Sequence, residues 1–149
     1  TYAQEGLEQM AAGTRIPIIN GLSDDFHPCQ LLADLLTIRE HKGGTAGRTM
    51  TFIGDGRSNM GHSYLLGGVT AGMHVRVVSP DGYLPREDVV ADARRIAAET
   101  GGSVLVGSDI VELTTGADIV VTDTWVSMGF EAEKQRRLEA PTSSTGRNR

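Results

Sequence analysis

The feature that most constrains this fold is a regular alternation of short apolar runs and helical patterns between Thr49 and Thr122. The apolar runs have the length and composition of strands, and they are Met50–Gly54, His74–Ser79, Ser103–Gly107 and Asp118–Thr122. The helical patterns between them are Asn59–Ala71, Arg86–Glu99 and Ser108–Thr115. Strands that alternate with helices of this length form right-handed crossovers in a parallel sheet. The alternation therefore predicts an α/β fold with a doubly wound parallel sheet.

The last of these apolar runs leads into a polar loop. Ile119–Val121 is a continuous β-branched run, which predicts a strand buried on both faces. Asp123 would then stand at the carboxyl end of that strand, at the sheet edge where α/β proteins bind ligands. Ser127 and Gly129 follow, before the helical pattern Glu131–Leu138. A carboxylate can hold an ammonium, and amides at a helix N-terminus can hold a carboxylate, so the loop suits a zwitterion. The alternative is an ordinary turn with a solvated aspartate and a capping serine.

Composition and charge exclude several classes of protein. The chain has 149 residues, of which 39% are hydrophobic, enough for the core of one ordinary domain. No stretch approaches the ~20 apolar residues of a membrane span, and Thr1–Gly13 lacks the pattern of a secretory signal. The net charge of −5 argues against a nucleic-acid partner. The single cysteine, Cys29, fits a reducing cytoplasm, and the four scattered histidines indicate no metal site.

The chain ahead of the alternating region opens with a short amphipathic helical pattern, Tyr2–Ala12. Ile16–Asn20 then predicts a short strand, placed at a sheet edge because Pro17 cannot donate a ladder hydrogen bond. The next helical pattern, Gln30–Glu40, has leucine or isoleucine over nearly its whole circumference, which predicts cover by protein on more than one side. This pattern suits a connector between two domains, with a boundary near Gly43.

Residues at the start of this connector helix form the first candidate ligand-contacting pair. Pro28 belongs at the first helical position, which places His27 at the N-cap and Gln30 in the first turn. A histidine can donate to a carbonyl oxygen and a glutamine can accept from an amide, so the pair suits a carbamoyl-like group. Plain helix capping is the alternative. We expect Cys29 to be a buried small hydrophobe.

The first strand-to-helix turn of the alternating region offers two further interpretations. Gly54 and Gly56 begin a G-x-G pattern, which allows a nucleotide-binding half-domain. That pattern is weak, because Asn59 replaces the third glycine and the next strand ends without an acidic residue. Asn59 would instead offer its amide toward the same sheet edge as Asp123. A simple N-cap is the alternative role for Asn59.

Three of these motifs, in one order, resemble the ornithine carbamoyltransferases. They are Phe26–Gln30, Gly54–Met60 and Asp123–Gly129, and the resemblance covers Thr1 to Leu138. The serine-methionine-glycine of the last motif singles out ornithine among the transcarbamylases. The resemblance implies transfer of the carbamoyl group of carbamoyl phosphate to the δ-amine of ornithine, giving citrulline and phosphate.

The resemblance also assigns residues and partners. It implies that His27 and Gln30 contact carbamoyl phosphate, and that four residues hold ornithine: Asn59, Asp123, Ser127 and Met128. Ser58 stands where the family usually has a second asparagine. No cofactor is expected. A homo-oligomer, a homotrimer in the family, is implied, and the partners are small-molecule substrates rather than nucleic acid or a membrane.

Two family motifs do not occur in this sequence. The phosphate-binding Ser-Thr-Arg-Thr-Arg loop is expected upstream of Thr1, and the His-Cys-Leu-Pro loop downstream of Arg149. By resemblance, residues 1–43 are the end of the carbamoyl-phosphate domain with the connecting helix, 44–139 an incomplete ornithine-binding domain, and 140–149 a disordered tail. We therefore expect no activity from the chain alone. The alternative is a non-catalytic fragment or amino-acid-binding module that assembles with a full-length subunit.

Overall fold

The computed structural model describes residues 2–126 of the chain. Its elements in order are α1 (Gln4–Ala12), α2 (Pro28–Lys42), β1 (Thr49–Ile53), α3 (Asn59–Thr70), β2 (His74–Val78), α4 (Glu87–Thr100), β3 (Ser103–Gly107), α5 (Ile110–Thr114) and β4 (Ile119–Thr122). The expected helix at 131–138 and the expected tail at 140–149 lie outside the described residues.

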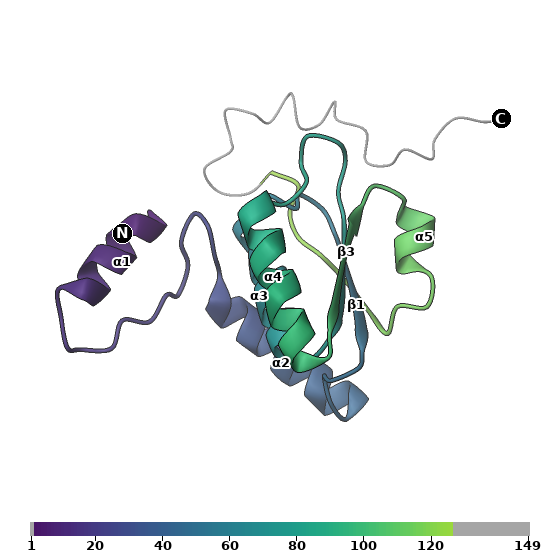
Figure 1. Cartoon of the computed structure of the whole chain (residues 1–149), viewed down its shortest axis with the longest axis horizontal. Helices are drawn as coiled ribbons and strands as arrows, with labels where there is room; N and C mark the ends of the chain where they lie inside the picture. The colour runs from purple at the N-terminus through teal and green to yellow at the C-terminus, as the bar shows by residue number, and fades with distance from the viewer. Residues whose placement is uncertain (1, 127–149) are drawn as a thin grey trace.

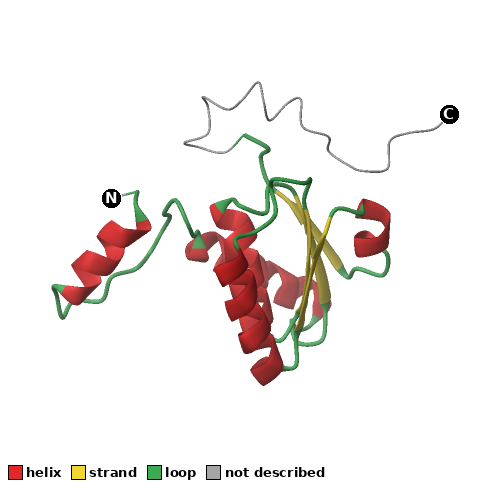
Figure 2. Cartoon of the chain, turned by 45° about the horizontal axis from the view of Figure 1, so that its top comes forward, coloured by secondary structure: helices red, strands yellow, loops and turns green. Residues whose placement is uncertain are grey.

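The strands form one four-stranded parallel sheet in the order β3-β2-β1-β4. Figure 1 shows α3 and α4 on one face of this sheet, α2 beyond α3, and α5 on the opposite face. Figure 2 shows the sheet between these two helical layers. The predicted doubly wound α/β fold is therefore confirmed, with element boundaries that differ from the predicted ones by a few residues.

The core lies between the sheet and the α3–α4 layer. Phe52 and Val75 from the strands pack there with Leu65 and Ala93 from the helices, each at most 1% exposed. Two adjacent glycines in α3 allow close packing, because a Cβ at Gly68 would lie 2.6 Å from Val75 Cγ2. The core is thus formed by apolar residues of the strands and helices that the sequence pattern predicted.

The N-terminal region differs from expectation. The helix predicted at 2–12 is present as α1, but none of its side chains is buried. The strand predicted at Ile16–Asn20 is wrong: the segment has no strand conformation, and Ile16 and Ile19 are 73% and 79% exposed. Its apolar residues lie away from the described sheet, so they have no strand with which to pair.

Helix α2 is covered on one side only within the described part of the chain. Leu31 and Ile38 are buried at 6% and 7% exposure, whereas Leu32 and Leu36 are 65% and 46% exposed. The expectation of cover on more than one side is therefore wrong for residues 2–126. Cys29, expected to be buried, is exposed on the first turn of the same helix.

Strand β4 is not buried on both faces as its sequence predicted. Its exposure alternates along the strand, and Val120 is 55% exposed. The reason is position: β4 is the last strand in the order of the described sheet. The short helix α5 packs nearer β1 and β2, where Thr51 Oγ1 donates to the Leu113 carbonyl oxygen at 2.7 Å.

Candidate functional site

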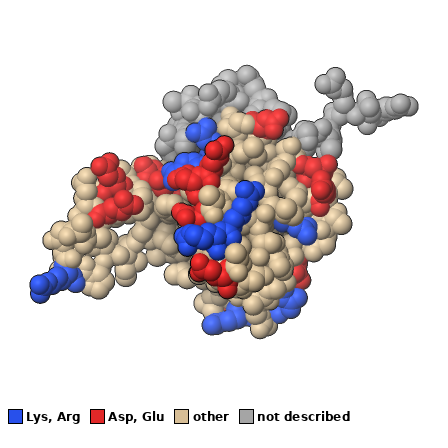
Figure 3. Space-filling view, viewed as in Figure 1, with Lys and Arg blue, Asp and Glu red and all other residues tan. Residues whose placement is uncertain are grey.

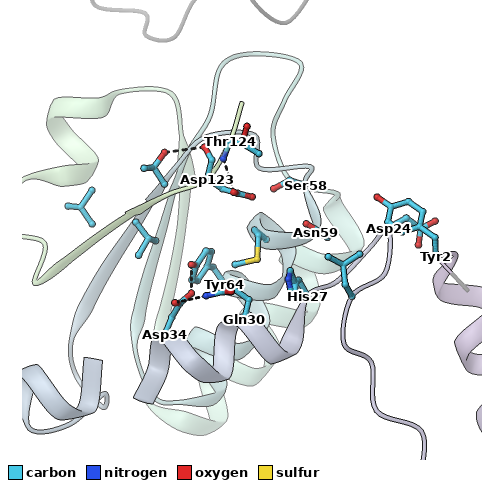
Figure 4. Close-up of a pocket in the computed structure, with 15 residues that line it drawn as sticks. Tyr2, Asp24, His27, Gln30, Asp34, Ser58, Asn59, Tyr64, Asp123 and Thr124 are labelled. Carbon is cyan, nitrogen blue, oxygen red and sulfur yellow. Dashed lines mark hydrogen bonds between the residues drawn. The ribbon is translucent and has the colours of Figure 1, made fainter. Parts of the chain in front are cut away.

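An open pocket of about 570 Å³ lies where β1 and β4 end, next to the start of α2. The chain leaves β1 toward β2 on one side, while β4 lies on the other side of β1, so this is the switch point of the sheet. Ligands of doubly wound proteins bind at such a point. Figure 4 shows Asp123 on one side of the pocket, with Gln30 and Asp34 of α2 facing it.

The turn from β1 to α3 forms one wall of the pocket, and buried contacts fix its shape. Ser79 Oγ, at the end of β2, accepts from the Gly56 N–H at 2.9 Å and donates to the Gly54 carbonyl oxygen at 2.8 Å. A Cβ at Gly56 would lie 2.7 Å from both Ser79 Oγ and Pro85 Cδ. Close packing therefore explains why residue 56 is glycine, and binding of a nucleotide phosphate is not needed to explain it.

Ser58, rather than Asn59, is the N-cap of α3. Its hydroxyl accepts from the Gly61 N–H at 3.0 Å, so the capping alternative for Asn59 is wrong. Asn59 is the first helical residue, and its Nδ2 donates to the Ser23 carbonyl oxygen at 2.9 Å. This bond joins α3 to the loop that precedes α2. Asn59 Oδ1 accepts no hydrogen bond from the described residues, and the residue lines the pocket.

The start of α2 has the expected geometry. Pro28 is in the first turn and His27 is the N-cap residue, but the His27 side chain makes no capping hydrogen bond. Its backbone N–H instead donates to Ser63 Oγ of α3 at 2.8 Å. The imidazole lines the pocket, and its buried Nδ1 has no hydrogen-bond partner among residues 2–126. Buried polar atoms without partners are rare in proteins, so this histidine is an exception that capping does not explain.

Gln30 belongs to a hydrogen-bonded group on the α2 side of the pocket. Its Nε2 donates to Asp34 Oδ1 at 3.0 Å, and the Tyr64 hydroxyl of α3 donates to Asp34 Oδ2 at 2.6 Å. Tyr64 is 5% exposed. Burial, reinforced by the hydrogen bond to Asp34, raises the pKa of Tyr64 well above its ordinary value. The phenol therefore remains protonated and keeps donating to Asp34 at neutral pH.

A buried histidine of α3 joins the loop before α2 to the start of α4. His62, 1% exposed, has Nδ1 3.3 Å from the Asp25 carbonyl oxygen, and its Nε2 accepts from the Arg86 N–H at 3.4 Å. The Arg86 guanidinium forms an ion pair with Asp25 at 2.6 Å. Burial, and then the nearby positive charge of Arg86, lower the pKa of His62. A neutral His62 with its proton on Nδ1 satisfies both hydrogen bonds.

The pocket brings together four of the residues predicted from the sequence: His27, Gln30, Asn59 and Asp123. Ser127 and Met128 lie outside the described residues. Sequence reasoning missed Asp34 and Tyr64. The spacing of four residues from Gln30 places Asp34 on the same helix face and could have indicated it. Tyr64 comes from another helix, and no sequence pattern connects it with Gln30.

The charge of the pocket lining is acidic. Three of its residues are Asp24, Asp34 and Asp123, and none of the described lining residues is Lys or Arg. Asp123 is exposed, and its Oδ1 accepts from the Thr124 N–H at 2.7 Å, which fixes the carboxylate at the end of β4. Elsewhere on the molecule, acidic and basic side chains lie interspersed on the face seen in Figure 3. The described lining thus suits an ammonium better than a phosphate.

Comparison with known proteins identifies the family. The profile of the "Aspartate/ornithine carbamoyltransferase, Asp/Orn binding domain" matches residues 46–144, and that of the "carbamoyl-P binding domain" matches residues 1–40. The chain belongs to the aspartate/ornithine carbamoyltransferase family. The ornithine carbamoyltransferase of Clavibacter sepedonicus is 71% identical over 138 residues, covering 93% of this chain and 45% of that protein.

Solved structures of the family agree with this assignment. The ornithine carbamoyltransferase of Pyrococcus furiosus is 43% identical with a TM-score of 0.86, and the match covers 93% of this chain and 44% of that one. That of Gloeobacter violaceus is 46% identical with a TM-score of 0.79, covering 83% of this chain and 43% of that one. The chain thus spans less than half the length of these relatives.

Residues 2–126 lack two features that would indicate a protein of another class. None of their helices is long and apolar enough to cross a membrane. Their histidine, cysteine, aspartate and glutamate side chains form no group of three or more that could hold a metal ion.

Proposed function

We propose that this chain serves in ornithine carbamoyl transfer, in which the δ-amine of ornithine attacks the carbamoyl carbon of carbamoyl phosphate. The products are citrulline and phosphate. The observation that carries the proposal is the single pocket in which His27, Gln30, Asn59 and Asp123 meet at the switch point of the sheet. Family membership and the names of the relatives support it.

Ornithine would bind on the side of the pocket formed by β4 and α3. The Asp123 carboxylate would accept from an ammonium of ornithine, and Asn59 Oδ1 would supply a second acceptor nearby. Ser127 and Met128 would complete this half of the site. The acidic lining supports the assignment because it attracts a cationic amino acid. The δ-amine must lose its proton before it can attack.

The carbamoyl group would lie against the start of α2. An N–H of the His27 imidazole can donate to the carbonyl oxygen of the carbamoyl group, where negative charge develops during attack. Gln30 Oε1 can accept from the carbamoyl N–H. The two residues are three positions apart around the first turn of α2, so one small group can contact both.

The proposed division into two domains assigns one side of the pocket to each domain. Residues 1–43 would belong to the carbamoyl-phosphate side and residues 44–139 to the ornithine side, a division supported by the separate profile matches at 1–40 and 46–144. The substrates would meet where α2 approaches the sheet edge. Assembly as a homo-oligomer and a cytoplasmic location are further parts of this proposal. The exposed Leu32 and Leu36 of α2 support the assembly, because they offer apolar surface to another protein.

A second candidate function is amino-acid binding without catalysis, in a complex with a full-length subunit. The acidic pocket favours it, because the described lining offers no Lys or Arg to a phosphate group. An assay for citrulline separates the two candidates.

Purified alone, the chain should form no citrulline above background from ornithine and carbamoyl phosphate. It does not contain the family's phosphate-binding Ser-Thr-Arg-Thr-Arg motif, and the loss of even one oxyanion donor typically lowers an enzyme's rate ~10²–10³-fold. Mixed with the separate parts of the Clavibacter sepedonicus relative that flank the matched region, it should form citrulline, and the His27→Ala variant should not. Turnover by the chain alone would contradict the expectation of inactivity. Binding of ornithine with no turnover in any mixture would favour the second candidate.

A further inference from the structure

We propose that Asp34 is a positioning residue, which, held by Tyr64, orients the carboxamide of Gln30 so that its oxygen faces the pocket. The inference rests on the proposed function only for the identity of the ligand group that this oxygen meets. Neither residue was among the sequence-predicted site residues. Figure 4 shows Gln30 and Tyr64 both directed at the Asp34 carboxylate.

The two carboxylate oxygens of Asp34 have separate partners. Oδ1 accepts from Gln30 Nε2 at 3.0 Å, and Oδ2 accepts from the Tyr64 hydroxyl at 2.6 Å. The shorter bond comes from a phenol on α3 that is 5% exposed and therefore cannot easily turn away. Asp34 is thus fixed from the neighbouring helix, and in turn it fixes a side chain on its own helix.

This arrangement decides which end of the Gln30 amide faces the ligand. A carboxylate accepts hydrogen bonds and cannot donate them, so the NH₂ group of Gln30 must face Asp34. The oxygen Oε1 is then directed away from Asp34, where Gln30 lines the pocket. A carbamoyl group carries N–H donors, which an inward-facing oxygen can accept and an inward-facing NH₂ would repel. Asp34 would therefore select the productive orientation of Gln30.

The chain contains a matched pair that lacks the third partner. Gln9 Nε2 donates to Glu5 Oε1 at 3.1 Å, also four residues apart on a helix, and like the Gln30–Asp34 pair it is exposed. Within residues 2–126, however, Glu5 accepts no hydrogen bond from another helix, whereas Asp34 accepts one from Tyr64. Without a third partner, an exposed pair of this spacing stabilises a helix only slightly. The difference between Gln30 and Gln9 should therefore measure what Tyr64 and Asp34 contribute.

The first test compares the side-chain NH₂ signals of Gln30 and Gln9 by ¹⁵N NMR relaxation in the whole chain. We expect Gln30 to be the more ordered of the two, Asp34→Ala to bring it to the level of Gln9, and Tyr64→Phe to lower its order while the aromatic ring keeps its packing. Backbone amide spectra report whether each variant remains folded. Equal mobility of the two glutamines in the original chain, or an unchanged Gln30 in Asp34→Ala, would overturn the proposal.

The second test identifies the ligand group, with L-citrulline as a stable probe that carries the carbamoyl group and L-ornithine as a probe without it. We expect Asp34→Ala to weaken citrulline binding about three- to ten-fold, the range of the one neutral hydrogen bond that Gln30 would lose, and ornithine binding by less than about two-fold. Weakening of ornithine binding as large as that of citrulline would overturn the orienting role, and a larger effect on ornithine would show that Asp34 acts through its charge. If the original chain binds ornithine but not citrulline, the proposed contact of Gln30 with the carbamoyl group fails, and the NMR test still decides whether Asp34 positions Gln30.

Discussion

The Asp123 side chain at the end of β4 could contribute to ligand binding through its charge or through its shape, and one substitution distinguishes the two. Asp123→Asn keeps the shape of the side chain but removes the charge that would hold an ammonium. We expect L-ornithine to bind at least about ten-fold more weakly, because a charge-assisted hydrogen bond contributes about 1.5–3 kcal/mol. Calorimetry would measure the change. The control is Asp92→Asn, which removes an equal charge from the exposed pair with Arg95 on α4. Equal affinity of the Asp123→Asn variant and the original chain would refute the assignment.

His62 is expected to make stability depend on pH. Its pKa in the folded chain is lowered below the ordinary value of 6.5, chiefly by burial, so the unfolded chain binds the proton more readily. The free energy of unfolding should therefore decrease as pH falls below about 6.5 toward the folded-state pKa, by up to about 1.4 kcal/mol per pH unit.

Urea unfolding at about pH 7.5, 6.5 and 5.5 would measure this dependence on either side of the ordinary histidine pKa. An NMR titration of the His62 ring would locate its own midpoint, independently of the carboxylates that protonate at lower pH. A ring that titrates at or above its ordinary value would contradict the prediction.

The turn that joins β1 to α3 packs against the first turn of α3 so closely that Gly61 has no room for a side chain. A Cβ at Gly61 would lie 2.7 Å from the Gly56 carbonyl oxygen and 3.0 Å from that of Asp55. We expect Gly61→Ala to lower the free energy of unfolding by about 1–3 kcal/mol through overpacking, despite the better helix propensity of alanine.

The control for this prediction is Gly21→Ala, since nothing lies within 4 Å of a Cβ at Gly21. We expect that variant to change stability by less than about 0.5 kcal/mol. Denaturant midpoints at constant m-value would measure both. Equal stability of the two variants would show that the turn can move away from α3.

A local sequence pattern was sufficient to predict the strands of the described sheet, but it also predicted one strand that does not form. The β-branched runs and helical periods predicted all four strands that residues 2–126 contribute to the sheet, because the apolar face of each element follows from its own residues. Ile16–Asn20 has a similar apolar run, yet it forms no strand. A strand needs a neighbour, and the segment's own residues carry no information about whether one is within reach.

The whole molecule presents apolar surface at one edge of its described sheet. Val120 of β4 is 55% exposed, and β4 is the last strand in the sheet order of residues 2–126. Exposed edges of this kind favour association with another chain. We expect concentration-dependent self-association by sedimentation velocity, and Val120→Lys should weaken it. A monodisperse monomer at high concentration would contradict the expectation.

The apolar periods and motifs of the chain were enough to predict the α/β class, the family, and four residues that share one pocket: His27, Gln30, Asn59 and Asp123. These were predictable because each stands at a strand end or helix start that its own neighbours define. Three features became visible only in the folded chain: which apolar residues of α2 are buried, the capping of α3 by Ser58, and the hydrogen bond from Tyr64 to Asp34. Those outcomes depend on contacts between elements far apart in the chain, and such contacts follow from packing rather than from any local period.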